Sequence, residues 1–151
     1  MPEPIILEYR GKPIFSILEE MTVFVEQSMR DAYLQFLVDQ NVLDEVAALD
    51  VRDMQQQETP PIGRLAVVEG VLTMKQIFRI LNAQGDSDRR FGELAIQMGF
   101  MKTPQLLILL DIQRTKRPGL NKIIMEMGLA DSKTLGTLRK EFLATIKEMV
   151  T

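Results

Sequence analysis

Residues 61–84, "PIGRLAVVEGVLTMKQIFRILNAQ", and residues 90–113, "RFGELAIQMGFMKTPQLLILLDIQ", share one pattern of residue types. In each copy, apolar residues at helical spacing lead to a glycine, two further apolar residues follow it, and a second apolar stretch runs to a closing glutamine. Glycine adopts the left-handed backbone that ends a helix, so each copy predicts two short helices joined by a tight turn. The sequence therefore predicts two copies of one small helical hairpin, with five residues between them.

The same phase extends over most of the chain. Gly70, Gly99 and Gly128 are 29 residues apart, and Asn41, which also adopts left-handed backbone readily, lies another 29 residues back. Hairpins of this kind stack because one alone cannot bury its apolar face, so the period by itself indicates a scaffold. Other residues that keep the period are Gln55, Gln84 and Gln113, and Ala48, Ile77, Leu106 and Leu135.

Capping residues are expected at the start of the second helix of each hairpin. Thr73 with Gln76 forms a capping box. Thr103 before Pro104 predicts an N-cap followed by proline at the first helical position. The remaining N-cap candidates are Asp44 and Asp131.

These patterns predict a mainly α fold of tandem short helical hairpins with a long C-terminal helix over 132–150. A small N-terminal β element is expected from the β-prone "IILEY" (5–9), with "PIFSIL" (13–18) as its second strand. Apolar residues at helical spacing place the first helix at about 27–40.

The polar, proline-terminated stretch "QQQETPP" (55–61) is interpreted as a linker. It divides the chain into an N-terminal section, 1–57, and a tandem-repeat domain, 58–151. The polar stretch "GDSDR" (85–89) is a tight connector between the two copies.

Composition excludes several classes of function. Apolar residues make up 46% and charged residues 26%, as in a soluble globular protein, and there is no Cys or His. Without them the chain lacks a thiolate nucleophile, the commonest general base and the commonest transition-metal ligand, so we expect no enzyme, catalytic residue, metal site or cofactor. The net charge of −3 argues against binding of a nucleic acid polymer.

The location of the protein is also constrained. The N-terminal "MPEPIILEYRGK" has acids and prolines where a signal peptide needs a basic and then a long apolar segment. No apolar run reaches membrane-spanning length. We therefore expect a cytoplasmic protein that does not insert directly into a membrane.

The doubled 24-residue pattern resembles the tandem motif of the MshEN-type cyclic-di-GMP-binding domain, which is found in the N-terminal part of type II secretion and type IV pilus assembly ATPases. That motif begins Arg-Leu-Gly, places a glycine between aliphatic pairs and closes on glutamine, twice, with a five-residue spacer. The resemblance covers residues 61–113, about a third of the chain. No phosphate-loop pattern GxxxxGK[ST] is present, so the resemblance implies a regulatory module without the ATPase.

The resemblance also implies a ligand site. Its leading arginine matches Arg90, whose guanidinium has the geometry to donate two parallel hydrogen bonds to O6 and N7 of guanine. In the first copy Pro61 stands at that position, and Arg64, three residues on, is the candidate substitute. Glycine at each helix start would let backbone N–H groups approach a phosphate. The implied ligand-binding residues are Ile62, Gly63, Arg64, Ile77, Leu81, Gln84, Arg90, Phe91, Gly92, Leu106, Leu110 and Gln113.

Two hypotheses about function follow. In the first, the protein is a bacterial second-messenger effector that binds cyclic-di-GMP and thereby changes its affinity for a protein partner that the sequence does not name. In the alternative, it is a protein-interaction adaptor that keeps the fold and has lost the ligand. The feature that discriminates between the two hypotheses is the leading position of the motif, which is Arg90 in the second copy and Pro61 in the first.

Two other features have simpler interpretations. The basic run "RTKRPGLNK" (114–122) could meet a phosphate or an acidic partner but is more often a solvated connector. Asp86 and Asp88 lie in the predicted turn, where aspartate is favoured for local hydrogen bonding rather than for catalysis.

Overall fold

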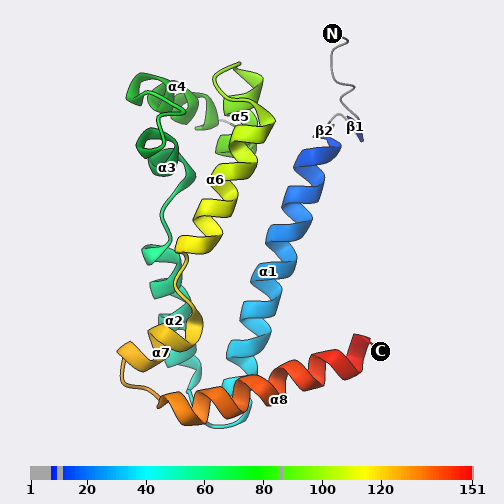
Figure 1. Cartoon of the computed structure of the whole chain (residues 1–151), viewed down its shortest axis with the longest axis vertical. Coiled ribbons are helices and arrows are strands. Elements are labelled where there is room, and N and C mark those ends of the chain that lie inside the picture. Colours follow the sequence, from blue (N-terminus) through cyan, green and yellow to red (C-terminus); the bar gives the residue numbers. More distant parts are fainter. Residues whose placement is uncertain (1–7, 10–11, 86, 151) are drawn as a thin grey trace. The chain divides into compact units, whose positions relative to one another are not determined.

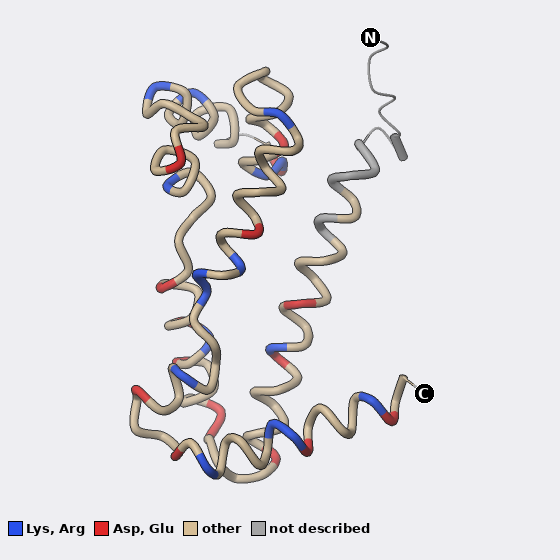
Figure 2. Tube along the Cα trace, viewed as in Figure 1, with Lys and Arg blue, Asp and Glu red and all other residues tan. Residues whose placement is uncertain are grey.

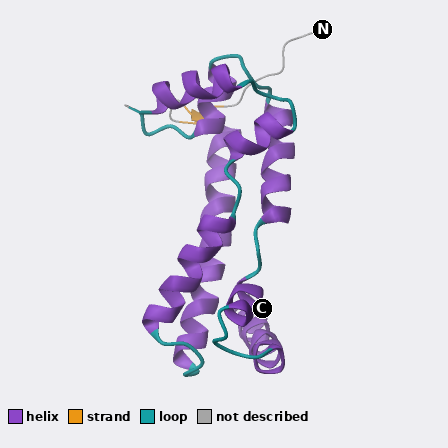
Figure 3. Ribbon diagram, turned by 90° about the vertical axis from the view of Figure 1, so that its left-hand side faces the viewer, coloured by secondary structure: helices purple, strands orange, loops and turns teal. Residues whose placement is uncertain are grey.

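The computed structural model describes residues 8–9, 12–85 and 87–150, and the mainly α fold predicted from the sequence is confirmed (Figures 1 and 3). The C-terminal helix has the predicted bounds. The elements are β1 (Glu8–Tyr9), β2 (Lys12–Pro13), α1 (Ile14–Asp39), α2 (Glu45–Glu58), α3 (Ile62–Val68), α4 (Met74–Gln84), α5 (Phe91–Gln97), α6 (Thr103–Lys116), α7 (Leu120–Glu126) and α8 (Ser132–Val150). We number the hairpins in chain order: hairpin 1 is α1–α2, hairpin 2 is α3–α4, hairpin 3 is α5–α6 and hairpin 4 is α7–α8.

A left-handed residue separates the two helices of every hairpin, as the 29-residue period predicts. In hairpin 2 the Gly70 N–H donates to the Val67 carbonyl (3.1 Å) and the Val71 N–H donates to the Ala66 carbonyl (2.8 Å), which together form a Schellman motif. The same pair of bonds occurs in the other three hairpins. The positive φ angles within the described chain are 61° at Asn41, 72° at Gly70, 76° at Gly99 and 71° at Gly128.

The carbonyl that accepts the bond from the residue after the left-handed residue always belongs to a buried residue. These acceptor residues are themselves 29 apart, and each is 0% exposed. A buried carbonyl without a donor is costly, so the turn that reverses the chain also satisfies a polar group of the core. The four acceptor residues are Leu37, Ala66, Ala95 and Ile124.

The contacts group the chain into two compact units. Unit 1 comprises Met1–Asp53 and Leu120–Thr151, and unit 2 comprises Met54–Gly119. In unit 2, α3 packs on α6 and α4 packs on α5, so the first helix of each middle hairpin lies against the second helix of the other. The predicted sections 1–57 and 58–151 are each continuous in the sequence, whereas unit 1 combines two separate segments. The division into these two sections stays a prediction about domains.

In unit 1 the outer hairpins meet through aromatic side chains of α1 and α8. The rings of Tyr33 and Phe36 lie 5.2 Å and 5.5 Å from the ring of Phe142, measured between centroids. The Tyr33 hydroxyl donates a hydrogen bond to Oδ1 of Asn121 in α7 (2.6 Å). Burial raises the pKa of this hydroxyl, so it remains a donor across the physiological range.

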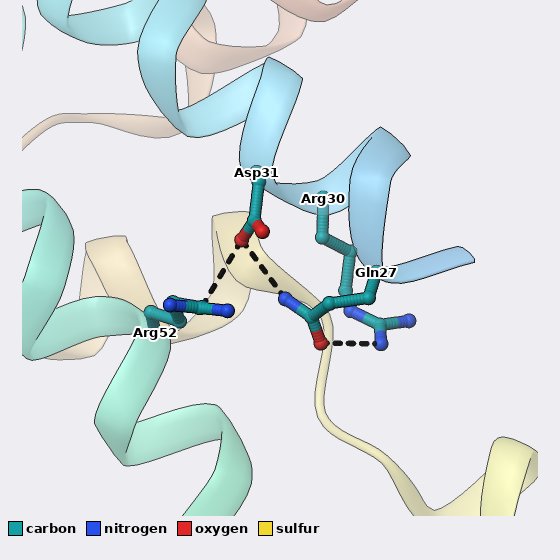
Figure 4. A network of polar contacts seen from close by, with 4 residues as sticks. All are labelled: Gln27, Arg30, Asp31 and Arg52. Atoms are coloured by element: carbon teal, nitrogen blue, oxygen red, sulfur yellow. Dashed lines mark hydrogen bonds and ion pairs between the residues drawn. The ribbon is translucent and has the colours of Figure 1, made fainter. Parts of the chain in front are cut away.

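A polar network connects α1 to α2 within hairpin 1 (Figure 4). Nε of Arg52 lies 3.1 Å from Oδ1 of Asp31, which also accepts a hydrogen bond from Nε2 of Gln27 (2.9 Å). Nη2 of Arg30 donates to Oε1 of the same glutamine (2.9 Å). The two side chains of the ion pair are nearly half exposed, so the network orients the helices more than it stabilises them.

The sequence correctly predicts two paired strands near the N-terminus, but the predicted bounds of the second strand are wrong. Glu8 pairs with Pro13 and Tyr9 pairs with Lys12 in antiparallel register. Helix α1 then begins at Ile14, so most of the stretch predicted as a second strand is helical, and the predicted start near 27 is wrong. A short apolar run suits either strand or helix by periodicity alone, and here it continues the helix of the residues that follow. Residues 5–7 of the first predicted strand lie outside the described residues.

The predicted linker 55–61 is also shorter than expected. Residues 55–58 complete α2, since glutamine and glutamate favour helix, and three residues separate α2 from α3. Gln55 is 6% exposed, and its Nε2 donates to the Pro118 carbonyl (2.8 Å), which explains why this polar residue is buried.

Three of the four predicted caps are confirmed, at Asp44, Thr73 and Asp131. The N-cap predicted at Thr103 is wrong by one residue. Lys102 is the N-cap, its N–H donates to Oε1 of Gln105 (2.9 Å), and Pro104 is second in the helix. Lys102 keeps the 29-residue phase of the other three caps, so the repeat sets the helix start even where the side chain is unable to accept a bond.

The left-handed turns can be tested with one chemical change at two glycines. No atom lies within 4 Å of a Cβ built on Gly99 or on helical Gly136, so neither substitution to alanine creates a clash. We expect Gly99→Ala to lower the free energy of unfolding by about 1–2 kcal/mol, from left-handed strain. Gly136→Ala should raise it by about 0.5–1 kcal/mol, from helix propensity. Urea unfolding measures both, and a gain in stability from Gly99→Ala would contradict the turn assignment.

Candidate functional site

The two motif copies are joined by the glutamines that close them. Nε2 of Gln84 donates to the Arg89 carbonyl (3.3 Å), directly before the second copy, and Nε2 of Gln113 donates to the Pro60 carbonyl (3.0 Å), directly before the first copy. The end of each copy is therefore bonded to the start of the other. If the two copies are exchanged, each glutamine bond takes the place of the other, and the α3–α6 pair takes the place of the α4–α5 pair. Unit 2 therefore has an approximate two-fold arrangement.

The centre of this arrangement lies where α3 meets α5. A Cβ on Gly63 would lie 3.3 Å from Cζ of Phe91 and 3.5 Å from Cδ1 of Ile77. The Phe91 ring therefore lies against the backbone of the other copy, and a larger residue than glycine would push it away. The start of each copy is thus close to this central contact.

The second glycine of the pattern is held by its own hairpin. A Cβ on Gly92 would lie 2.8 Å from both Cδ atoms of Leu106, a side chain that is 1% exposed. Gly63 and Gly92 are therefore required by packing. Their expected role towards a phosphate stays a prediction, and the seven-residue helices in whose first turns they lie are too short to supply much dipole.

The implied aliphatic contacts fall into two groups. Ile77 and Leu106 are buried and form part of the core of unit 2. Ile62 and Leu110 are half-buried, whereas Leu81 is exposed. The half-buried and exposed side chains are the ones that remain accessible to a ligand.

The two leading positions have the same backbone conformation. Pro61 has φ −68° and ψ 150°, and Arg90 has φ −75° and ψ 155°, each directly before its helix. The Arg90 N–H donates to Oε2 of Glu93 (3.3 Å), which fixes the start of α5. Arg64 is exposed in the first turn of α3. An arginine at position 61 would thus occupy the backbone setting that Arg90 already has.

Charge is distributed unevenly between the two units by sequence. Figure 2 shows where the charged residues lie along the described chain. Unit 2 contains nine basic and six acidic residues, a net charge of +3, and the residues of unit 1 carry −6. The total of −3 conceals this division, so composition alone missed an electropositive unit. Counting charges within the repeat would have found it.

The features with simpler interpretations give no second site. Arg114 and Lys116 lie in the last turn of α6, where cations offset the helix dipole, and Lys122 lies 3.9 Å from Glu126 in α7. Asp88 is exposed, and Asp86 lies outside the described residues. Among the residues with described positions, no three acidic side chains gather as a metal site would require.

Comparison with other proteins identifies no relative of this chain. No protein-family model matches the chain, and no curated protein or solved structure matches it. Over the part of the chain that the structure covers, no helix has the length and apolar composition needed to cross a membrane.

The glutamine bonds can be tested by removing one donor. Gln113→Leu leaves the Pro60 carbonyl without this partner, and we expect the free energy of unfolding to fall by about 1 kcal/mol or more. Gln97→Leu, at an exposed position of the same unit, is the matched control and should change stability by less than about 0.5 kcal/mol. Equal losses in both variants, measured by urea unfolding, would show that the bond contributes nothing.

Proposed function

We propose that unit 2 is a regulatory module that binds cyclic-di-GMP across the two paired motif copies. The observation that carries the proposal is the reciprocal bonding of Gln84 and Gln113, which pairs the copies about an approximate two-fold. Cyclic-di-GMP has two equivalent guanosine halves, so a two-fold surface offers each half the same set of side chains.

The chemistry of the accessible side chains supports this ligand class. Arg90 supplies a guanidinium for the O6 and N7 edge of one guanine, a charge-assisted and bidentate contact. Phe91 is half-buried at the central contact, where its ring can meet a base or ribose. The net charge of +3 on unit 2 favours a ligand with two phosphates.

The two halves of the proposed site are unequal, because the first copy has Pro61 in place of arginine. One guanine would therefore lack its bidentate partner unless Arg64 reaches it. The absence of His and Cys from the sequence supports a binding module rather than an enzyme. A bacterial second messenger of this kind acts in the cytoplasm, which is where we place the protein.

The role of Arg90 can be tested by titration calorimetry with cyclic-di-GMP. Arg90→Ala should weaken binding by about 1–3 kcal/mol, the value of a bidentate guanine contact. Arg79→Ala, at an exposed basic position of α4, removes the same charge from unit 2 and should change affinity by less than about 1 kcal/mol. GTP and cyclic-di-AMP serve as ligand controls. Unchanged affinity in Arg90→Ala would mean that the site is elsewhere.

The unequal halves make a second, opposite prediction. Pro61→Arg should strengthen cyclic-di-GMP binding, or create it, because the backbone at position 61 already matches that of Arg90. The substitution is made with and without Arg64→Ala, since Arg64 in the native protein would crowd the new arginine if it already fills the gap. If neither background binds while circular dichroism shows an intact helical fold, the adaptor hypothesis replaces the effector hypothesis.

A further inference from the structure

Helix α4 exposes an apolar row with a basic edge. Met74, Phe78 and Leu81 recur at intervals of four and three residues, so they share one side of the helix, and each is 47–58% exposed. Lys75 and Arg79 directly follow the first two and line one edge of this row, and both are exposed. Neither side chain forms an ion pair or a hydrogen bond with a residue that the structure describes. We call these five residues the α4 face.

Helix α2 exposes an apolar row with acidic residues beside it. Val46 and Leu49 are 68% and 57% exposed. Asp50 and Asp53 follow them at intervals of four residues, so they extend the same side of the helix, and both are exposed. Within the described part of the chain, neither carboxylate has an ion pair or a hydrogen bond. We call these four residues the α2 face, which is apolar and acidic where the α4 face is apolar and basic.

We propose that the α2 face of one copy of the chain binds the α4 face of a second copy. Side chains three and four residues apart form rows that pack between the rows of another helix, so the two exposed faces have matching shapes. The aspartates of one copy would meet Lys75 and Arg79 of the other. Opposite charges of this kind select the partner and fix its register, while burial of the apolar rows drives the association.

Contacts between two identical faces are disfavoured. Two α4 faces would bring the cations of both copies together, two α2 faces would do the same with the aspartates, and like charges across an interface oppose association. The contact is therefore heterologous, so a pair of copies keeps one free face of each kind and association continues into an open chain or closes into a ring. Each face spans about two helical turns, which buries less area than a standard interface of about 1,600 Å², so the association is weak.

An anionic membrane is a poorer occupant of the α4 face. Segments that bind anionic lipid typically carry clusters of roughly four to eight basic residues, whereas this face has Lys75 and Arg79 along one edge. A membrane would also leave the acidic α2 face without a partner. The inference does not rest on dinucleotide binding, although Leu81 also belongs to the implied ligand-binding residues.

The test reverses the charges of each face in turn in the full chain. Lys75→Glu with Arg79→Glu changes the α4 face, and Asp50→Lys with Asp53→Lys changes the α2 face. Sedimentation velocity at concentrations up to about 1 mM should show that the native chain forms concentration-dependent oligomers. Each double variant alone should self-associate at least about tenfold more weakly. An equimolar mixture of the two should associate again, because every contact between the two variants joins opposite charges.

Two controls keep the outcome decisive. Lys133→Glu with Lys140→Glu, at exposed positions of α8, changes the net charge as much as the α4 variant does and should associate like the native chain. If a charge variant loses helical content by circular dichroism, Phe78→Asp and Leu49→Asp replace the two pairs. Each of these alone should be monomeric, and their mixture should form a 1:1 dimer through the one intact pair of faces.

Three results would overturn the proposal. The first is a native chain that stays monomeric over this range, whether or not it binds phosphatidylserine vesicles. The second is a mixture that fails to associate although both variants are folded. The third is an equal loss of association in the α8 control, which would show that net charge and not the α4 face governs the association.

Discussion

A buried carbonyl at the end of each first helix needs a hydrogen-bond donor, and the left-handed turn that follows supplies it. Ala66 and Ala95 are fully buried, and each accepts this bond from the residue after a glycine with positive φ. The helices that carry them, α3 and α5, have seven residues each, well below the roughly 12–15 that an isolated helix needs. Such helices depend on the turn and on packing against the other copy, and the glutamine bonds connect the two copies.

The local parts of this arrangement were predictable from the sequence, and the long-range parts were not. Gly70 and Gly99 identify their turns because few residues tolerate left-handed backbone. Thr73 identifies its helix start because a hydroxyl there accepts a backbone N–H. No residue type in the sequence identifies the pairing of hairpin 2 with hairpin 3 in this way. Gln113 was recognised as a repeated residue, but its acceptor, the carbonyl of Pro60, is a backbone group that every residue has.

The structure also separates the residues of the motif by what each does. Gly63, Gly92, Ile77 and Leu106 pack against one another's hairpins or the core, so they would be retained by any chain that keeps this fold. Arg90 is half-buried directly before α5, where its backbone N–H donates to Glu93. The candidate site was therefore predictable only as a whole motif, because the residues required for folding and the residues proposed to bind a ligand share the same spacing.

The pairing of the two middle hairpins is tested most directly by nuclear Overhauser effects in an isotope-labelled sample of the full chain. Phe91 and Gly63 are far apart in the sequence and touch only if α5 lies against α3 across the two copies. Pairing predicts cross-peaks between the Phe91 ring protons and the Gly63 Hα protons, together with cross-peaks from the Gln113 side-chain amide to Pro60. Tertiary cross-peaks confined to residues of the same hairpin would contradict it.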